Sequence, residues 1–111
     1  MNKSIKSTLK KYIIKFNVGC IYCGRKYNKT RRISADHIQP KEQGNYLDLS
    51  NIAISCDICN SRLKRNMSIE EFIQIDPRIK TNIQTYLNKI KKIIINGESY
   101  YHSIKWIEKI L

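Results

Sequence analysis

Apolar residues recur every three or four positions near the start of the chain, a spacing typical of an amphipathic helix. Within residues 3–16 this pattern is carried by Ile5, Leu9, Tyr12, Ile13 and Phe16. Gly19 follows shortly afterwards, and glycine is favoured just beyond the C-terminus of a helix. The pattern therefore predicts an N-terminal helix that ends before Gly19.

In the middle of the chain the pattern changes to an alternation of apolar and polar residues, which is typical of short strands. One run covers residues 33–38 and the second covers residues 51–55. A polar loop over residues 39–50 separates them. We expect a β-hairpin with a long connection, followed by a helix over residues 57–65.

Helical spacing returns in the last third of the chain. Ser68 and Glu71 form a capping box that predicts the start of one helix, and Asp76-Pro77 predicts the start of another. Asn96-Gly97 is expected to end this second helix, and residues 99–111 are expected to form a last one. The two apolar stripes, which we interpret as core, are Ile79, Ile83, Tyr86, Leu87, Ile90, Ile93 and Ile94, and then Tyr100, Ile104, Ile107 and Leu111.

The length of 111 residues is that of one domain. We divide it into a basic N-terminal helix (1–19), a central core (20–72) and a helical extension (73–111). The net charge of +12 is concentrated in residues 1–35, which hold ten Lys or Arg and no Asp or Glu. Nucleic acid is the partner that fits best, because each basic side chain that neutralises a phosphate releases a counterion. A charge excess that only aids solubility is the alternative.

No stretch of the sequence has the character of a signal peptide or a membrane span. We therefore expect a cytoplasmic protein that has no membrane partner. In such a reducing setting, paired cysteines bind metal more often than they form disulfides. A secreted toxin exported without a cleavable signal is the alternative in which disulfides would form.

Four cysteines form two Cys-x-x-Cys pairs, Cys20 with Cys23 and Cys56 with Cys59. Two such pairs supply the four thiolates of a closed tetrahedral zinc site, which leaves no position for a substrate and is therefore structural. The alternative is two redox motifs, but neither pair lies in the βαβ pattern of thioredoxin-like proteins. We predict one structural Zn²⁺.

Between and after these pairs the chain carries Asp36-His37-Ile38-x-Pro40, then Asn51-Ile52, then Asn60 directly after Cys59. This order closely resembles the HNH endonucleases with a ββα-metal fold, over residues 20 to about 72. The spacings from His37 to Asn51 and from Asn51 to Asn60 are similar to those in the HNH domain of RNA-guided nucleases. The resemblance implies an α+β protein: a ββα-metal core stapled by the four-cysteine zinc site, with an N-terminal helix and additional C-terminal helices.

The resemblance also implies a role for each motif residue. Asp36 and Asn60 would bind one Mg²⁺ or Mn²⁺ ion, His37 would be the general base, and Asn51 would hold the long loop. The chemistry of hydrolysis favours the same assignments, because histidine is suited to deprotonating water near neutral pH and oxygen ligands suit hard cations. Adjacent strand residues point to opposite faces, so Asp36 and His37 share a site only where the strand ends.

The sequence departs from the family pattern at three positions. Asn60 stands where many members have a final metal-binding histidine, and Gly44 stands alone where a glycine pair is common. Leu63 replaces a lysine often found three residues after the last ligand, with Arg62 and Lys64 on either side. Either of these two basic residues could touch the phosphate.

Taken together, these features predict a metal-dependent endonuclease, with DNA chosen as its substrate by analogy. The residues expected to contact nucleic acid are Arg25, Lys26, Lys29, Arg31, Arg32, Arg62 and Lys64. The alternatives are a zinc-ribbon module that binds nucleic acid without cutting it and a zinc-stapled protein-interaction domain. The sequence leaves open a homodimer and a partner protein of a defence or mobile-element system.

Overall fold

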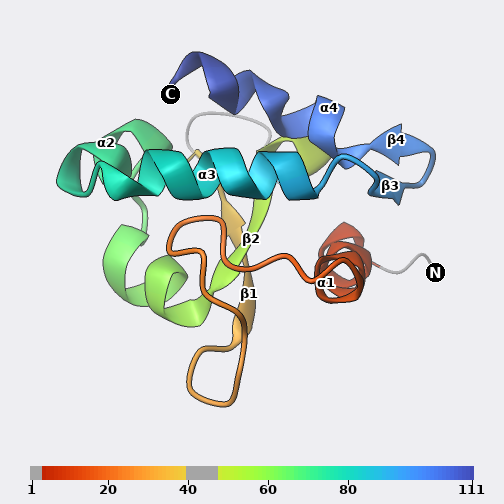
Figure 1. Cartoon of the computed structure of the whole chain (residues 1–111), viewed down its shortest axis with the longest axis horizontal. Coiled ribbons are helices and arrows are strands. Elements are labelled where there is room, and N and C mark those ends of the chain that lie inside the picture. Colours follow the sequence, from red (N-terminus) through yellow and green to blue (C-terminus); the bar gives the residue numbers. More distant parts are fainter. Residues whose placement is uncertain (1–3, 40–47) are drawn as a thin grey trace.

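A two-stranded antiparallel hairpin lies at the centre of the computed structural model, which describes residues 4–39 and 48–111 (Figure 1). Strand β1 (Ile33–His37) pairs with β2 (Ile52–Cys56), with Ile33 opposite Cys56 and His37 opposite Ile52. Every residue of β2 is buried. The predicted hairpin is confirmed, while Pro40 and Gly44 of its connection lie outside the described residues.

Two helical segments enclose this hairpin, one on each side (Figure 1). On one side lies α1 (Ile5–Lys15), whose first turn is capped by the Ser4 hydroxyl and whose Leu9 and Ile13 are fully buried. On the other side lies η3 (Ile58–Lys64), a π-helical segment that follows β2 directly. The predicted N-terminal helix and the helix after the second strand are both confirmed.

The helix predicted from Asp76-Pro77 is shorter than expected. It forms α3 (Arg78–Lys89), and Asn96-Gly97 is instead the turn of a small hairpin between β3 (Ile94–Ile95) and β4 (Glu98–Ser99). The φ angles of Asn96 and Gly97 are 51° and 83°. A type I′ hairpin turn of two residues needs positive φ at both positions, which Asn-Gly provides, and isoleucines favour strands. Ile94 is accordingly exposed and does not belong to the helical core stripe.

Residues 99–111 do not form one continuous helix, as we had expected. A short helix, α4 (Tyr100–Ile104), is followed by a 3₁₀ segment, η4 (Lys105–Lys109). The capping box of Ser68 and Glu71 is confirmed at the start of α2 (Ile69–Ile75). A single 3₁₀ turn, η2 (Leu49–Asn51), leads into β2.

The C-terminal segments are hydrogen-bonded to the central hairpin. The Tyr100 hydroxyl donates to the Ile52 carbonyl at 2.7 Å, and the Tyr86 hydroxyl accepts from the Ile54 amide at 3.1 Å. The Trp106 indole donates to the Ser50 carbonyl at 2.8 Å. These bonds attach β2 and the turn before it to α3, α4 and η4.

No helix within the described ranges is long and apolar enough to cross a membrane.

Candidate functional site

The four cysteine sulfurs converge on one point, although 32 residues lie between the two pairs in the chain. All four sulfur atoms lie within 4.8 Å of one another, and those of Cys23 and Cys56 are 3.9 Å apart. Four thiolates at this spacing suit tetrahedral zinc, whose bonds to sulfur are about 2.3 Å long. The prediction that these four residues lie together in position to bind one metal ion is confirmed.

The first cysteine pair is shaped by a tight turn. The Gly24 amide donates to the Cys20 carbonyl and the Cys20 amide donates to the Arg25 carbonyl, both at 2.9 Å. Gly24 has a φ of 75°, which glycine adopts at little cost. Gly19 packs against this turn so closely that a Cβ there would lie 2.6 Å from the Gly24 carbonyl oxygen. Both glycines therefore help to close the first half of the metal site.

Backbone amides and one arginine surround the sulfurs with hydrogen-bond donors. The Tyr22 amide lies 3.3 Å from the Cys20 sulfur, and the Cys59 amide lies 3.4 Å from the Cys56 sulfur. A hydrogen bond from Cys59 lowers the pKa of Cys20 to about 5. This arrangement favours a thiolate at Cys20, the form that binds zinc. Burial raises the pKa of Cys23, and the hydrogen bond to Cys20 raises the pKa of Cys59.

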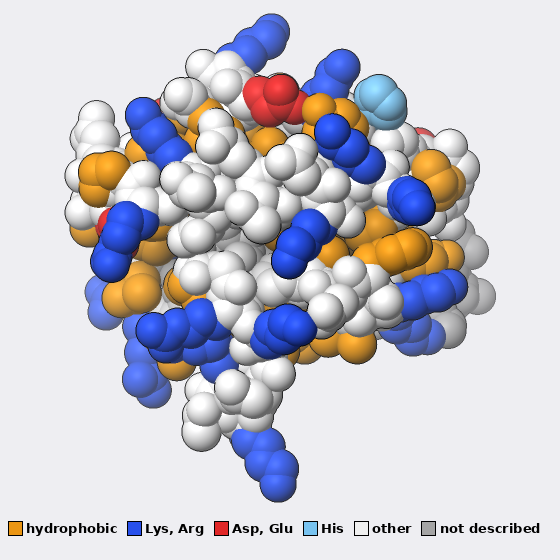
Figure 2. Space-filling model, in the orientation of Figure 1, with side chains coloured by type: hydrophobic (Ala, Val, Ile, Leu, Met, Phe, Trp, Pro, Cys, Tyr) orange, Lys and Arg blue, Asp and Glu red, His pale blue; other side chains and the backbone are white. Residues whose placement is uncertain are grey.

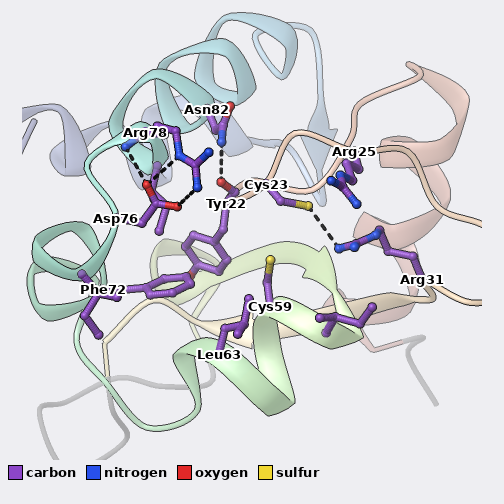
Figure 3. Close-up of a pocket in the computed structure, with 13 residues that line it drawn as sticks. Tyr22, Cys23, Arg25, Arg31, Cys59, Leu63, Phe72, Asp76, Arg78 and Asn82 are labelled. Atoms are coloured by element: carbon purple, nitrogen blue, oxygen red, sulfur yellow. Dashed lines mark hydrogen bonds and ion pairs between the residues drawn. The ribbon is translucent and has the colours of Figure 1, made fainter.

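Arg31 lies against the cysteine cluster and not out in solvent. Its Nη1 is 3.1 Å from the Cys56 sulfur and 3.5 Å from the Cys23 sulfur, and Figure 3 shows it reaching Cys23. A zinc ion with four thiolates carries a net charge of about −2, which a guanidinium at this distance offsets. Arg31 is one of the residues predicted to contact nucleic acid, and the structure places its guanidinium against the cysteine sulfurs.

Asp36 lies on β1, facing η3, and is only 4% exposed. Its Oδ2 accepts a hydrogen bond from the Tyr22 hydroxyl and lies 3.1 Å from the Nζ of Lys64. Burial raises the pKa of Asp36, while the positive charge of Lys64 and the hydrogen bond from Tyr22 oppose this rise. The carboxylate is thus held firmly in place by residues of two other segments.

The position of Lys64 differs from the prediction that this residue contacts nucleic acid. Its side chain is 1% exposed, and its Nζ also donates to the His37 carbonyl at 2.8 Å. A buried ammonium needs such partners, because an unpaired charge in the interior is costly. In this position Lys64 does not reach a nucleic acid on the surface, so it belongs to the interior of the site.

His37 is the last residue of β1 and is half-buried. The chain bends at residues 38–39, so β1 runs through both residues of the Asp-His motif and ends directly after them. Strand alternation turns the side chains of Asp36 and His37 to different sides of β1. The positive charge of His37 is nevertheless among those that lower the pKa of Asp36.

Asn51 fixes the backbone that follows His37. Its Oδ1 accepts from the Gln39 amide at 2.9 Å, and its Nδ2 donates to the Gln39 carbonyl at 3.1 Å. The Asn51 carbonyl also accepts from the Ile38 amide at 2.9 Å. These bonds fix the two residues after His37, which is the kind of role expected for Asn51.

Gln39 is a site residue that sequence reasoning missed. Its Oε1 accepts from the Ile69 amide at 3.3 Å, and its Nε2 donates to Glu70 at 3.0 Å. It thereby links the strand end to the first turn of α2. In the sequence it occupies the variable position of Asp-His-Ile-x-Pro, and no signal there indicated a role.

Asn60 attaches η3 to β1. Its Nδ2 donates to the Ser34 hydroxyl at 2.7 Å and to the Ala35 carbonyl at 3.2 Å. Ser34 and Asp36 lie two residues apart on β1 and share a face. The structure therefore brings Asn60 to the same side of the strand as Asp36. π-Helical turns such as η3 are rare and occur frequently at functional sites.

A pocket of about 570 Å³ lies beside the metal site, between the first cysteine turn and helices α2 and α3 (Figure 3). Its lining includes Tyr22, Cys59, Leu63 and Phe72. Asp36, His37, Asn51 and Asn60 are not among the residues that line it. The pocket therefore lies apart from the candidate catalytic residues, with the Tyr22 side chain between them.

The remaining predicted contact residues lie on the surface. Arg25, Lys26, Lys29, Arg32 and Arg62 are all exposed. Figure 2 shows basic side chains spread over one face of the molecule and at the tip of the loop before β1, with few acidic ones among them. This distribution suits contact with an extended polyanion.

The comparisons with known proteins agree with the geometry of the central core. The family model of the HNH endonucleases matches residues 20–66, which run from the first cysteine pair to just beyond η3. No curated protein and no solved structure matched the chain. Residues 20–66 thus match the HNH endonuclease domain, as the order and spacing of the motifs predicted.

Proposed function

We propose that this protein is a metal-dependent endonuclease that hydrolyses phosphodiester bonds in nucleic acid, with DNA as the substrate. The observation that carries the proposal is the occurrence of Asp36, His37, Asn51 and Asn60 on the hairpin and on the segments that contact it, within the HNH match. A module that only binds nucleic acid has no need for this combination.

In this proposal His37 takes the proton from the attacking water. Asn51 supports it by fixing the backbone of residues 38 and 39, so that the end of β1 keeps one conformation. Because the backbone next to His37 is already fixed, less entropy is lost when the substrate binds, which favours catalysis. Asn51 is therefore a positioning residue.

Asp36 and Asn60 are the residues that would hold the divalent ion. Both lie on the η3 side of β1, and a carboxylate with an amide oxygen suits Mg²⁺ or Mn²⁺. When bound, such an ion neutralises the charge that develops on the phosphate and on the leaving oxygen. The cysteine cluster would hold zinc and keep η3, and with it Asn60, in place.

The exposed basic residues should supply most of the affinity for nucleic acid. Because Arg31 lies on the metal site, a test of binding should leave it intact and reverse Arg25, Lys26, Lys29 and Arg32 to glutamate. We expect weaker binding and a shallower dependence of log Kd on log salt concentration, since fewer counterions are released. Fluorescence anisotropy with labelled DNA measures both.

The matched control reverses four exposed lysines of the C-terminal half, Lys80, Lys89, Lys91 and Lys92. It makes the same change in net charge and should weaken binding less. If this control variant loses more affinity than the first, the binding surface lies on the helical extension and the proposed contacts are wrong.

Replacing Asn60 with alanine should raise the Mg²⁺ concentration needed for half-maximal cleavage by about tenfold or more, because one oxygen ligand is lost. Excess metal should restore part of the rate. A titration of cleavage rate against Mg²⁺ measures the shift. A rate that falls equally at every Mg²⁺ concentration would show instead that Asn60 only holds η3 on β1.

One observation favours a second candidate, a zinc module that binds nucleic acid without cutting it. The Asp36 carboxylate is already paired with Lys64 and therefore has a cationic partner without a metal ion. Absence of cleavage by the wild-type protein with Mg²⁺ or Mn²⁺, on duplex and single-stranded DNA and on RNA, would favour this second function.

A further inference from the structure

Three buried polar side chains meet at one oxygen atom in the interior of the core. The Tyr22 hydroxyl and the Lys64 ammonium both contact Oδ2 of Asp36. None of the three residues is more than 4% exposed. One carboxylate oxygen therefore contacts both a neutral donor and a positively charged group, and all three side chains are shielded from water.

Both donors belong to segments that the cysteine cluster holds. Tyr22 lies between Cys20 and Cys23 in the first turn, and its amide also faces the Cys20 sulfur. Lys64 ends η3, which begins between Cys56 and Cys59. The metal site thus fixes two sides of the Asp36 carboxylate.

The position of Lys64 matters for any cation that approaches Asp36. Its Nζ lies 3.1 Å from Oδ2 and 2.8 Å from the His37 carbonyl oxygen, so it bridges the two residues of the Asp-His motif. A divalent cation on the same carboxylate would meet this positive charge at short range, and with little water between them the repulsion is weakly screened. Without a divalent ion, the same charge stabilises the buried carboxylate.

We propose that Lys64 is a positioning residue that acts as the internal counter-ion of Asp36: it holds the carboxylate when no divalent ion is bound and lowers the affinity for that ion. This inference rests on the proposed function, in which Asp36 is a ligand of the catalytic metal. It assigns Oδ2 to Tyr22 and Lys64, so that a divalent ion would bind through Oδ1.

A lysine that only fills space in the core and a lysine that acts as a counter-ion differ in their effect on metal binding. In both cases, removing the lysine should destabilise the protein in the absence of a divalent ion. Only removal of a counter-ion also makes the divalent ion bind more tightly. The affinity for Mn²⁺ and the thermal stability are therefore measured on the same samples, with the cysteine site loaded with zinc.

In zinc-loaded protein, Lys64→Met should lower the Mn²⁺ dissociation constant, measured by electron paramagnetic resonance, by about tenfold or more. It should also lower Tm in the absence of Mn²⁺, and Mn²⁺ should raise its Tm by more than it raises that of the wild type. Lys80→Met, which removes an exposed lysine on α3, controls for the loss of one charge. It should leave both quantities near their wild-type values.

Tyr22→Phe tests whether charge or hydrogen bonding to Oδ2 sets the affinity. This variant removes the neutral donor and keeps Lys64, so its Mn²⁺ dissociation constant should change by less than about threefold. If Lys64→Met does not fold, Lys64→Gln keeps a hydrogen-bond donor without the charge, and the same tighter binding is expected.

An unchanged or weaker affinity for Mn²⁺ in folded Lys64→Met or Lys64→Gln would overturn the inference and leave the proposed function intact. Asp36→Asn separates the two claims, because it should abolish Mn²⁺ binding if Asp36 is the ligand. Equal binding by wild type and Asp36→Asn would remove the proposed metal site, and the role of Lys64 with it.

Discussion

Replacement of His37 with alanine should lower the rate of DNA cleavage by about 10²–10⁴-fold, the usual effect of removing a general base. The zinc content, the thermal stability and the affinity for DNA should stay close to those of the wild type. The backbone of His37 pairs with Ile52 and accepts a hydrogen bond from Lys64. Alanine keeps both interactions, so the loss should appear in the chemical step, measured as a single-turnover rate at saturating enzyme.

The chain offers a matched control in its other histidine. His102 is exposed on α4, outside the HNH match, and His102→Ala should cleave at the wild-type rate. Equal cleavage by wild type and His37→Ala would mean that another group is the base or that the activity comes from a contaminating nuclease.

Replacement of Cys56 with serine should have the largest effect on folding. Cys56 is fully buried, and its sulfur accepts from the Cys59 amide and from Arg31. Binding of a structural zinc contributes about 10–16 kcal/mol in zinc-finger peptides, which is as large as the whole stability of a typical domain. We expect loss of bound zinc and of the cooperative thermal transition.

Elemental analysis and circular dichroism on protein purified under reducing conditions measure the two outcomes for Cys56→Ser. The variant should also lose cleavage, although Cys56 is not part of the proposed chemistry. Retention of one zinc per chain together with a wild-type unfolding midpoint would contradict the structural role of the cluster.

The elements that the sequence predicted well are those with local signals. The cysteine pairs, the alternation in the two strands and the capping box of Ser68 and Glu71 each depend on spacings of a few residues. The order of these signals was specific enough to indicate the family, and the match over residues 20–66 confirmed it. The chemical roles of Asp36, His37, Asn51 and Asn60 stay predictions.

The details that the sequence did not predict depend on contacts between distant segments. Lys64 stands in a basic run with Arg62 and Arg65, and its sequence context is that of a surface residue. The π-helical turn of η3, closed by the bond from the Arg65 amide to the Asn60 carbonyl, is longer than an α-helical turn. It brings Asn60 and Lys64 against β1 and leaves Leu63 half exposed.

Arg31 illustrates the same limit. Nothing distinguishes it from Arg32 in the sequence, yet the loop before β1 directs Arg31 to the sulfurs of Cys23 and Cys56 and leaves Arg32 exposed. Charge patterning finds a basic segment, but it does not tell which of its members offset the charge of a metal site. Asn96-Gly97 is a similar case, because the dipeptide is compatible with a helix end and with a hairpin turn.

The most direct test of the central claim is the conversion of supercoiled plasmid by zinc-loaded wild-type protein, with and without Mg²⁺ and beside a His37→Ala sample purified in parallel. We expect nicked or linear plasmid only with the wild-type protein and Mg²⁺, while both proteins bind the DNA equally. Equal conversion by the two samples, or conversion without any divalent ion, would contradict it.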